Sequence, residues 1–433
     1  TSIDATKTYP DVGFCMPTVR APSGFVYNRY NGRGTRIYAG RRTTDPILSG
    51  TGLRPQPYLC ELIKRLMSAL GYEVRQNQLE QTMFKNLFIV NTLFTKEYAK
   101  MLKGWTVKDF LEEVERLTGV VFVTDNTDPE PPTCDIILKT VYYQEATQFT
   151  IRNVTDAYET EVEDDDSREA EFSSSDVAYD LPDGRWAKLM KLPEGFLDSA
   201  KTQDFYGMAE LIRALDSADN NTVLHDTLTG RRYINVTRTY TPYNSEEEKT
   251  DRYTIEIDQF SDLDREGTDS TLELKITPAP MAQLGYMCCE VVDLGTNDGY
   301  KEYSTSEDEE EDSETDDGDV ESRIRAFEKK ESQAINLYCA FHSGNVYGIC
   351  PIAYTDAYHA SLQGLLYPLS YAAGDAFAIN DTASLRLKDI DEGYFQGGYE
   401  IDTGKAYTIE TYDPNVIDPR QVYVIRNKRF RSE

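Results

Sequence analysis

Three histidines, His225, His342 and His359, are the side chains in this chain best suited to move protons or bind metals near neutral pH. None of them has a second histidine one helical turn away, an HExxH pattern or a nearby pair of cysteines. We therefore expect all three to serve packing or surface roles. The chain also lacks the GxSxG nucleophile elbow, the Walker phosphate loop and the glycine fingerprint of dinucleotide-binding folds.

Carboxylates offer a second kind of chemistry, because 75 Asp and Glu residues stand against 45 Lys and Arg in 433 residues. A pair of carboxylates across a cleft can hydrolyse a glycosidic bond, but the sequence singles out no particular pair. The spacing from Asp312 to Gly318 resembles a calcium-binding EF-hand loop only loosely. Its glycine comes one place late, and Arg323 replaces an acid that the loop requires. The sequence thus predicts no catalytic residue, no metal ligand and no cofactor.

The formal net charge of −30 restricts the partners of the protein. A protein that binds the nucleic-acid backbone needs cations to neutralise phosphates, so the charge opposes direct nucleic-acid binding and binding to an anionic membrane. No run of about 18 apolar residues predicts membrane insertion, and residues 1–4 show no signal-peptide pattern. The seven cysteines form no CxxC pair, which favours reduced, mostly buried thiols in a cytosol.

One segment departs from this acidic average. In residues 1–52, aromatic side chains interleave with arginines: Phe14, Phe25, Tyr27, Tyr30 and Tyr38 with Arg29, Arg33, Arg36, Arg41 and Arg42. In a basic protein this mixture would favour single-stranded nucleic acid. In a chain this acidic we expect it to contact the acidic body of a neighbouring subunit, because Arg and Tyr are enriched at interfaces.

The elements that must position any functional group are clearest in residues 53–143. Apolar residues recur at helical spacing and predict a helix over 59–70, and Gly71 stands where a left-handed C-terminal cap is favoured. Thr106 and Asp109 match the capping box of a second helix. Two amphipathic helices are therefore expected in this stretch.

Strands are expected between and after these helices. Short apolar runs at 84–90, 120–123 and 136–138 have the length and composition of buried strands, and Gly119 separates the second helix from the strand that follows. The order helix, strand, helix, strand, strand defines a small α+β module.

The rest of the chain alternates between strand patterns and acidic segments. Residues 233–240 and 252–257 predict a strand pair, and 205–215 predict one further helix. The fold class expected is α+β and predominantly antiparallel β, with several β-rich domains and one small helix–strand–helix–strand module. The expected division is an extended lead-in over 1–52, the α+β module over 53–143, a β-rich domain with one helix and an acidic loop over 144–300, an acidic low-complexity insertion over 301–322, and a C-terminal β-rich segment over 323–433.

The chain starts abruptly at Thr1 and stops in a strand pattern, Arg429–Arg431, which follows a strand at Val422–Arg426. We expect either that an initiator methionine was removed or that the sequence is a piece of a longer chain.

Several stretches at the two ends of the chain resemble tail proteins of tailed bacteriophages and prophages, of the baseplate-hub or tail-hub kind. They are Pro57–Leu66 with Gly71–Tyr72, Phe84–Asn91, Trp105–Val114, Ile401–Ile409 and Asp418–Phe430. The middle of the chain, including both acidic insertions, has no such match. The resemblance implies a β-rich hub whose copies form a threefold or sixfold ring, with no cofactor and no active site in this section.

We therefore expect a structural virion protein that is not an enzyme, is made in the host cytoplasm and joins the tail tube to the tip or to receptor-binding parts. Its partners would be other copies of itself, as a trimer or hexamer, and other tail proteins. The residues expected at the subunit interface belong to the module: Tyr58, Leu62, Phe84, Trp105 and Phe110.

Two alternatives stay open. A phage-associated glycan-binding module would use exposed tyrosines and Trp186 as stacking platforms, and 30 tyrosines make this possible. A cell-envelope glycan hydrolase would need two carboxylates facing each other across a cleft at about 5 to 10 Å.

Overall fold

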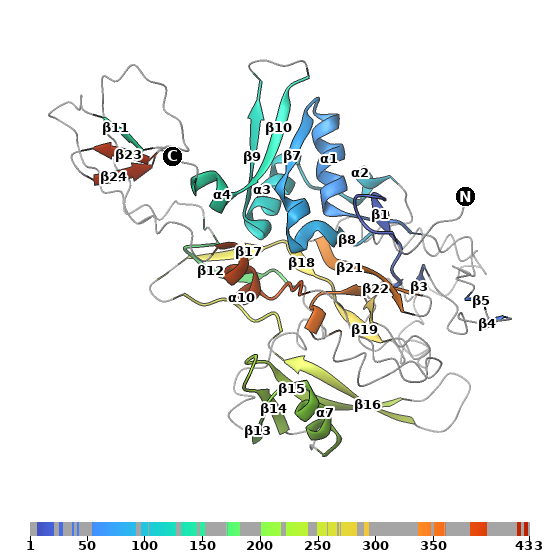
Figure 1. Ribbon diagram of the computed structural model, residues 1–433. Helices are drawn as coiled ribbons and strands as arrows, with labels where there is room; N and C mark the ends of the chain where they lie inside the picture. The colour runs from blue at the N-terminus through green and yellow to red at the C-terminus, as the bar shows by residue number, and fades with distance from the viewer. Residues whose placement is uncertain are drawn as a thin grey trace, which may run out of the picture.

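The computed structural model shows a mixed α and β protein in which most of the regular structure is sheet and most strand pairs are antiparallel (Figure 1). This confirms the α+β class. The structure describes residues 7–20, 26–28, 37–38, 41–42, 54–91, 97–102, 104–126, 131–144, 148–151, 170, 172–181, 201–217, 222–240, 249–257, 259–265, 268, 270–283, 290–293, 337–347, 350–358, 360, 382–395, 422–425 and 428–431.

The predicted module is built from helices packed on one face of a three-stranded sheet. The helices are α1 (Leu59–Ala69) and α3 (Val107–Thr118), and the strands are β7 (Glu73–Asn77), β9 (Val120–Asp125) and β10 (Thr133–Leu138). The central strand β10 pairs parallel with β7 and antiparallel with β9. Every second strand residue packs against the apolar faces of the helices in one core. The strand period of two and the helix period of 3.6 therefore place their apolar residues at the same interface.

The helix ends carry the caps that the sequence predicts. After α1, Gly71 adopts a φ of 91°. The Tyr72 amide donates to the Met67 carbonyl at 2.9 Å and the Gly71 amide to the Ser68 carbonyl at 3.1 Å, which is the Schellman arrangement. Before α3, Thr106 and Asp109 form the full capping box. These bonds satisfy backbone groups that a helix end otherwise leaves unpaired.

The stretch before β8 differs from the prediction of one strand over 84–90. The structure has two short 3₁₀ helices, Gln78–Gln81 and Met83–Asn86, and the strand β8 covers only Leu87–Ile89. Asn77 and Thr82 accept backbone hydrogen bonds at the starts of the 3₁₀ helices, which draws the chain out of extended conformation. Strand β7 was not predicted, because its residues are mostly polar and exposed.

A central layer lies beneath the module, and β8 belongs to it (Figure 1). Here β21 (Leu337–Tyr347) pairs with β8, β18 (Ile276–Pro278) and β22 (Cys350–Tyr354). Beside it, β12 (Asp176–Tyr179) pairs with β17 (Thr271–Leu274), and a short helical segment follows as α10 (Leu387–Ile390) and a π-helical turn, Asp391–Phe395. A single cluster of buried apolar residues runs through the module and this layer.

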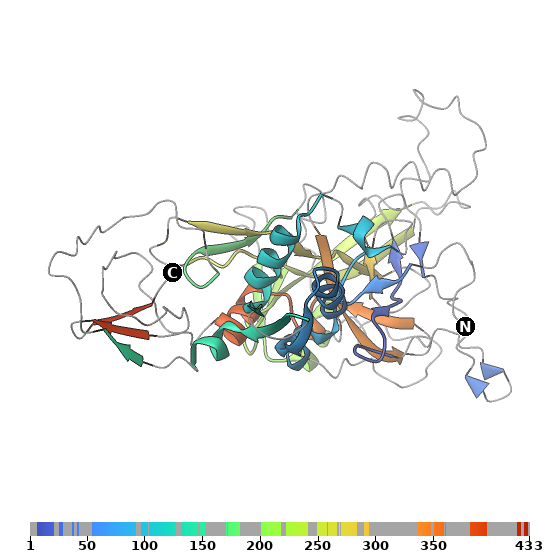
Figure 2. The ribbon, with the colours of Figure 1, turned by 90° about the horizontal axis from the view of Figure 1, so that it is seen from above.

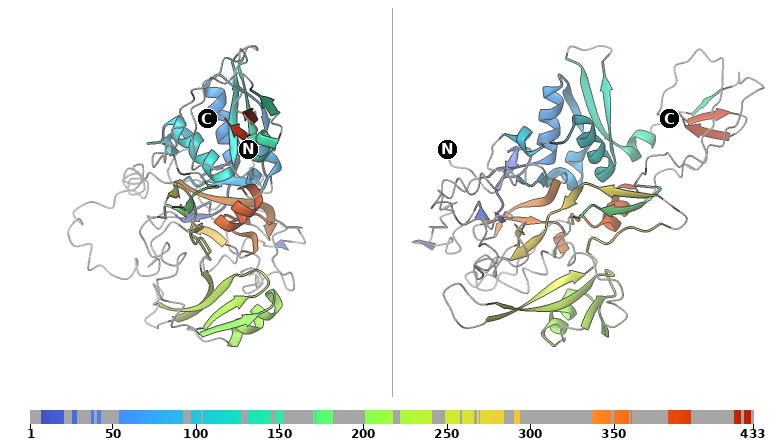
Figure 3. Two further views of the ribbon diagram at one scale, coloured as in Figure 1. Left: turned by 90° about the vertical axis from the view of Figure 1, so that its left-hand side faces the viewer. Right: turned by 180° about the vertical axis from the view of Figure 1, so that it is seen from behind.

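A third unit lies on the opposite side of the central layer from the module (Figures 1 and 3). Its sheet has the order β13 (Lys201–Phe205), β14 (Thr222–Asp226), β15 (Arg232–Tyr240) and β16 (Lys249–Ile257), with α7 (Met208–Ser217) alongside. The antiparallel pairing of β15 with β16 confirms the strand pair expected from the sequence, and α7 confirms the expected helix.

A small sheet stands apart from the rest of the described structure in two perpendicular views (Figures 1 and 2). It joins β11 (Gln148–Thr150), which follows the module closely, to the hairpin of β23 (Val422–Ile425) and β24 (Lys428–Arg431). The expected C-terminal hairpin is thereby confirmed.

The remaining elements are short. They are β1 (Phe14–Cys15), β2 (Val19–Arg20), β3 (Val26–Tyr27), β4 (Ile37–Tyr38), β5 (Arg41–Arg42), β6 (Gln56–Pro57), α2 (Tyr98–Met101), α4 (Lys139–Gln144), β19 (Met281–Gln283) and β20 (Glu290–Asp293). His359, Trp186 and the acidic insertion 301–322 lie outside the described residues. The domain boundaries at 52, 143, 300 and 322 stay a prediction.

Candidate functional site

The residues expected at a subunit interface lie inside the protein instead. Tyr58, Leu62, Phe84 and Phe110 are each at most 4% exposed and belong to the main core. The prediction is wrong for these four. Leu62 and Phe110 lie on the buried faces of α1 and α3, while Tyr58, just before α1, and Phe84, in a 3₁₀ helix, are buried in the same core, so none of them offers surface to a partner. Trp105 is half-buried and packs edge-on against Phe110, with ring centroids 6.5 Å apart.

Two histidines are placed by the structure. His342 is fully buried in β21, and its Nδ1 lies 2.7 Å from the Tyr58 hydroxyl. Burial lowers the pKa of His342 to about 3, so the ring is neutral. This confirms a packing role. His225 lies at the surface, 3.0 Å from Asp204.

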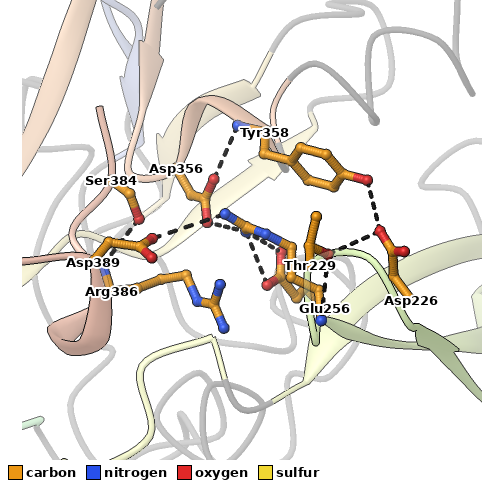
Figure 4. A network of polar contacts seen from close by, with 9 residues as sticks. Asp226, Thr229, Glu256, Asp356, Tyr358, Ser384, Arg386 and Asp389 are labelled. Carbon is orange, nitrogen blue, oxygen red and sulfur yellow. Dashed lines mark hydrogen bonds and ion pairs between the residues drawn. The ribbon is translucent and has the colours of Figure 1, made fainter. Parts of the chain in front are cut away.

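The strongest concentration of buried charge surrounds Arg231, in the turn before β15 (Figure 4). Its Nη1 donates to Glu256 on β16 at 3.1 Å and also to Asp356, just after β22. Its Nη2 lies 3.9 Å from Asp389 on α10. The side chains of Arg231, Glu256 and Asp356 are 8%, 1% and 1% exposed. Charged groups from the turn before β15, from β16 and from the segment after β22 therefore meet in one buried cluster.

Asp226 fixes the turn that carries Arg231. One carboxylate oxygen accepts from the amides of Gly207 at 3.3 Å and Leu228 at 3.0 Å. The other accepts from the hydroxyls of Thr229 at 2.8 Å and Tyr358 at 3.0 Å. The Arg231 guanidinium also stacks over the Tyr358 ring at 4.6 Å. The turn is therefore held from both sides, by its own residues and by the central layer.

The pKa shifts follow from this geometry. Burial alone would raise the pKa of Asp226, but the hydrogen bonds from Thr229, Leu228, Gly207 and Tyr358 outweigh it and hold that pKa below its usual range. Burial would lower the pKa of Arg231, and the charges of Glu256 and Asp356 raise it well above its usual value instead. Asp226 and Arg231 therefore both stay charged at neutral pH, and neither supplies a proton there.

The arrangement works as a joint. Arg231 and Glu256 belong to the β13–β16 unit, whereas Asp356, Tyr358 and Asp389 belong to the central layer. A buried charge is stable only when it is paired, so the cluster fixes how the unit sits on the layer. We name these residues, together with Asp226, the Arg231 joint. Glu256 and Asp356 bind the same guanidinium and do not face each other across an open cleft.

Sequence reasoning missed this joint. The only local signal is the turn sequence from Asp226 to Gly230, where Gly230 has a φ of 71°. The partners of Arg231 lie 25 and 125 positions away and belong to no recognisable motif.

Two other polar clusters are also internal. Arg265 donates to the carbonyls of Phe172 at 3.0 Å and Ser175 at 3.1 Å, and pairs with Asp391. Near the N-terminus, Asn28, at a φ of 50°, donates to the Pro17 carbonyl at 2.9 Å and accepts from the Arg54 amide at 2.8 Å. Each cluster ties distant segments of backbone together.

Comparison with known proteins adds no identity, since no family model, no curated protein and no solved structure matches the chain. Within the described residues, no group of three or more His, Cys, Asp or Glu is placed to hold a metal ion. A search of the same residues finds no helix that is both long and apolar enough to cross a membrane.

Proposed function

We propose that the protein is a structural component of a bacteriophage tail, of the baseplate-hub or tail-hub kind, whose function is self-assembly into a ring. The observation that carries this proposal is the small sheet of β11, β23 and β24. Among the described residues, its own core consists of Ile151, Tyr423 and Ile425, with Phe149 packed against them. A three-stranded sheet with so little apolar surface gains most of its stability by packing against something else.

Two further observations support an assembly role. The hairpin of β23 and β24 lies within the C-terminal stretch that resembles phage tail proteins, and β11 follows the module that carries the other resemblance. The polar clusters of the described residues all make internal contacts that position backbone, which suits a scaffold better than a catalyst.

The same proposal covers the domain organisation, the oligomeric state, the partners and the location of the protein. The chain would comprise several β-rich domains around one α+β module, assemble as a trimer or hexamer, contact other tail proteins, and reside in the virion after synthesis in the host cytoplasm. No enzymatic activity and no cofactor are included. An acidic lumen would repel DNA phosphates and ease their passage.

The solution mass tests the proposal. Light scattering of the whole chain at tens of micromolar should give one discrete trimer or hexamer at physiological salt. The same sample in high salt separates contacts between charges from apolar ones, because only the former are screened. A monomer at every concentration and salt would contradict self-assembly of this chain.

A glycan-binding module is the second candidate, favoured by one exposed aromatic side chain. Tyr206 is 65% exposed on a turn that Asp226 holds through the Gly207 amide. A rigid exposed tyrosine is a suitable platform for stacking a sugar ring. Binding on a glycan array that disappears in Tyr206→Ala, and not in Tyr72→Ala, would support this candidate.

A further inference from the structure

The sheet of the module has one face that its own helices leave uncovered. Val120, Phe122, Cys134 and Ile136 point into the core with α1 and α3. On the other face, Val121, Val123 and Ile137 are half-buried and lie outside the core cluster. Val121 is paired directly with Ile137, and Val123 with Asp135, so these side chains adjoin. An apolar stripe therefore runs along this outer face.

The outer face is also acidic. Asp125 and Asp135 lie on it by strand register, and Glu73 pairs with Thr133 at its edge. Arg75 brings one cation, which is paired with Asp135. From Leu117 to Leu138, a range that includes both strands, the sequence contains four acids and no Lys or Arg: Asp125, Asp128, Glu130 and Asp135.

The small sheet has the opposite character. Val422 and Val424 are half-buried, while Tyr423 and Ile425 fill its own core. Their strand partners are Arg431 and Arg429. Between Asp418 and Glu433 the sequence holds five cations and no acid: Arg420, Arg426, Lys428, Arg429 and Arg431. In a chain with a net charge of −30, this hairpin is therefore a basic stretch of sequence that also carries apolar residues.

Within one copy the two surfaces do not meet, because the small sheet stands apart from the β7–β10–β9 sheet (Figure 1). Only residues 145–147 separate α4 from β11, so the small sheet is tethered within about 14 Å of the module at full extension. α4 follows the Leu138 end of β10, whereas Asp125 and Glu73 lie at the Thr133 end, about 17 Å along the strand. The tether of the same copy therefore starts at the end of the sheet away from these acids. A neighbouring copy has no such tether.

We propose that the β11–β23–β24 sheet of one copy docks on the outer face of the β7–β10–β9 sheet of a second copy. Val422 and Val424 meet the stripe of Val121, Val123 and Ile137, while the cations of the hairpin meet Asp125 and Glu73. The two surfaces differ, so each copy donates one and accepts the other. A head-to-tail contact closes into a ring when its rotation divides a full turn, and the inference rests on the self-assembly proposed above.

Charge reversal tests the contact on the whole chain. Arg429→Glu with Arg431→Glu reverses the hairpin, and Glu73→Lys with Asp125→Lys reverses the outer face. Each double variant alone should associate at least about tenfold more weakly by light scattering, because like charges then oppose each other. In an equimolar mixture the two variants should alternate, since each hairpin is complementary only to the outer face of the other variant. A hexamer can alternate all round and should regain the wild-type mass, whereas a trimer keeps one like-charged contact, so for a trimer the recovery is expected in the quadruple variant. Lys64→Glu with Lys201→Glu, two exposed lysines elsewhere, is the matched control.

Each possible result either supports or overturns the proposed docking. Recovery in the mixture establishes the contact between copies. If both variants keep the wild-type mass, or if both lose it and neither the mixture nor the quadruple variant recovers it, the docking is wrong while self-assembly stands. A wild-type chain that is monomeric throughout overturns the ring and the docking together. Thermal unfolding of each variant identifies any that fails to fold, and the quadruple variant, whose surfaces are again complementary, repeats the test within one chain.

Discussion

Helix α3 and the turn between β14 and β15 both end at a glycine in the left-handed region, Gly119 at a φ of 67° and Gly230 at 71°. The ends of α3 are stabilised locally: Thr106 and Asp109 form the capping box at its start, and Gly119 caps its end. At the turn, Asp226 is held partly by Tyr358, 132 positions away. The module is stabilised by local pattern and apolar packing, whereas the Arg231 joint depends on charges that meet only in the folded chain.

This difference explains what each region does. Apolar packing tolerates small changes of volume, because neighbouring side chains can adjust. A buried charge tolerates almost none, because its partner remains buried and unpaired when it is removed. The module therefore supplies stability, and the joint supplies a defined placement of the β13–β16 unit.

Breaking the joint should give the largest effect. Arg231→Met leaves Glu256 and Asp356 buried without their shared cation, and we expect a loss of about 3–5 kcal/mol. The loss should be confined to the β13–β16 unit, seen as faster hydrogen exchange in β14 to β16 with no change in α3. Lys201→Met, an exposed lysine of the same unit, is the control. Unchanged hydrogen exchange in β14 to β16 of Arg231→Met would show that Arg231 does not fix the placement of the β13–β16 unit.

Removing a buried apolar side chain from the module should lower the free energy of unfolding somewhat less, and its effect should stay in the main core. Leu117 is fully buried in the main core. Leu117→Ala should cost about 3 kcal/mol through lost burial and the cavity left behind. Leu117→Met, which nearly conserves volume, should cost less than about 1.5 kcal/mol. Urea unfolding measures both. If Leu117→Ala also accelerates exchange in β14 to β16, the two regions are not independent.

The smallest effect is a difference in pH response. The folded pKa of Asp226 is lowered, so its contribution to stability is complete above its ordinary value of 3.8 and is lost as the pH falls through the folded pKa. Glu113 on α3 is the opposite case. Burial raises its pKa, so its charged form weakens the fold at neutral pH and protonation relieves that as the pH falls toward 4.5.

Urea midpoints between pH 3 and pH 7 measure this contrast. Asp226→Asn should flatten the acid-side loss of stability, and Glu113→Gln should remove the compensating gain. Parallel profiles for wild type and both variants would show that neither carboxyl contributes through its titration.

The sequence predicts the module well because its signals are local. The apolar spacing of α1 and α3, the cap at Thr106 and the glycines at 71 and 119 all act within a few residues of one another. The hairpin of β23 and β24 is predicted for the same reason. What local reasoning could not separate is a buried apolar face from an interface, and it therefore assigned Tyr58 and Phe110 to a partner when they belong to the core.

The joint and the central layer could not be predicted in this way. Arg231 has no motif around it that names Asp356 as its partner, and a charged residue in a polar turn is usually exposed. Strand β7 is mostly polar and is identified only by its pairing with β10. The acidic outer face and the basic hairpin are visible in the sequence as charges, but strand register is needed to place the acids beside an apolar stripe.

The pairing of β8 with β21 has a consequence for synthesis. All three residues of β8 are buried, and its neighbour Tyr58 meets His342 at a separation of 284 positions. At about 5–20 residues per second, the nascent chain holds this apolar strand without β21 for roughly 10–50 s before β21 leaves the ribosome. Closing so distant a contact also slows folding. We therefore expect that a chaperone which holds the nascent chain during translation raises the yield of folded protein.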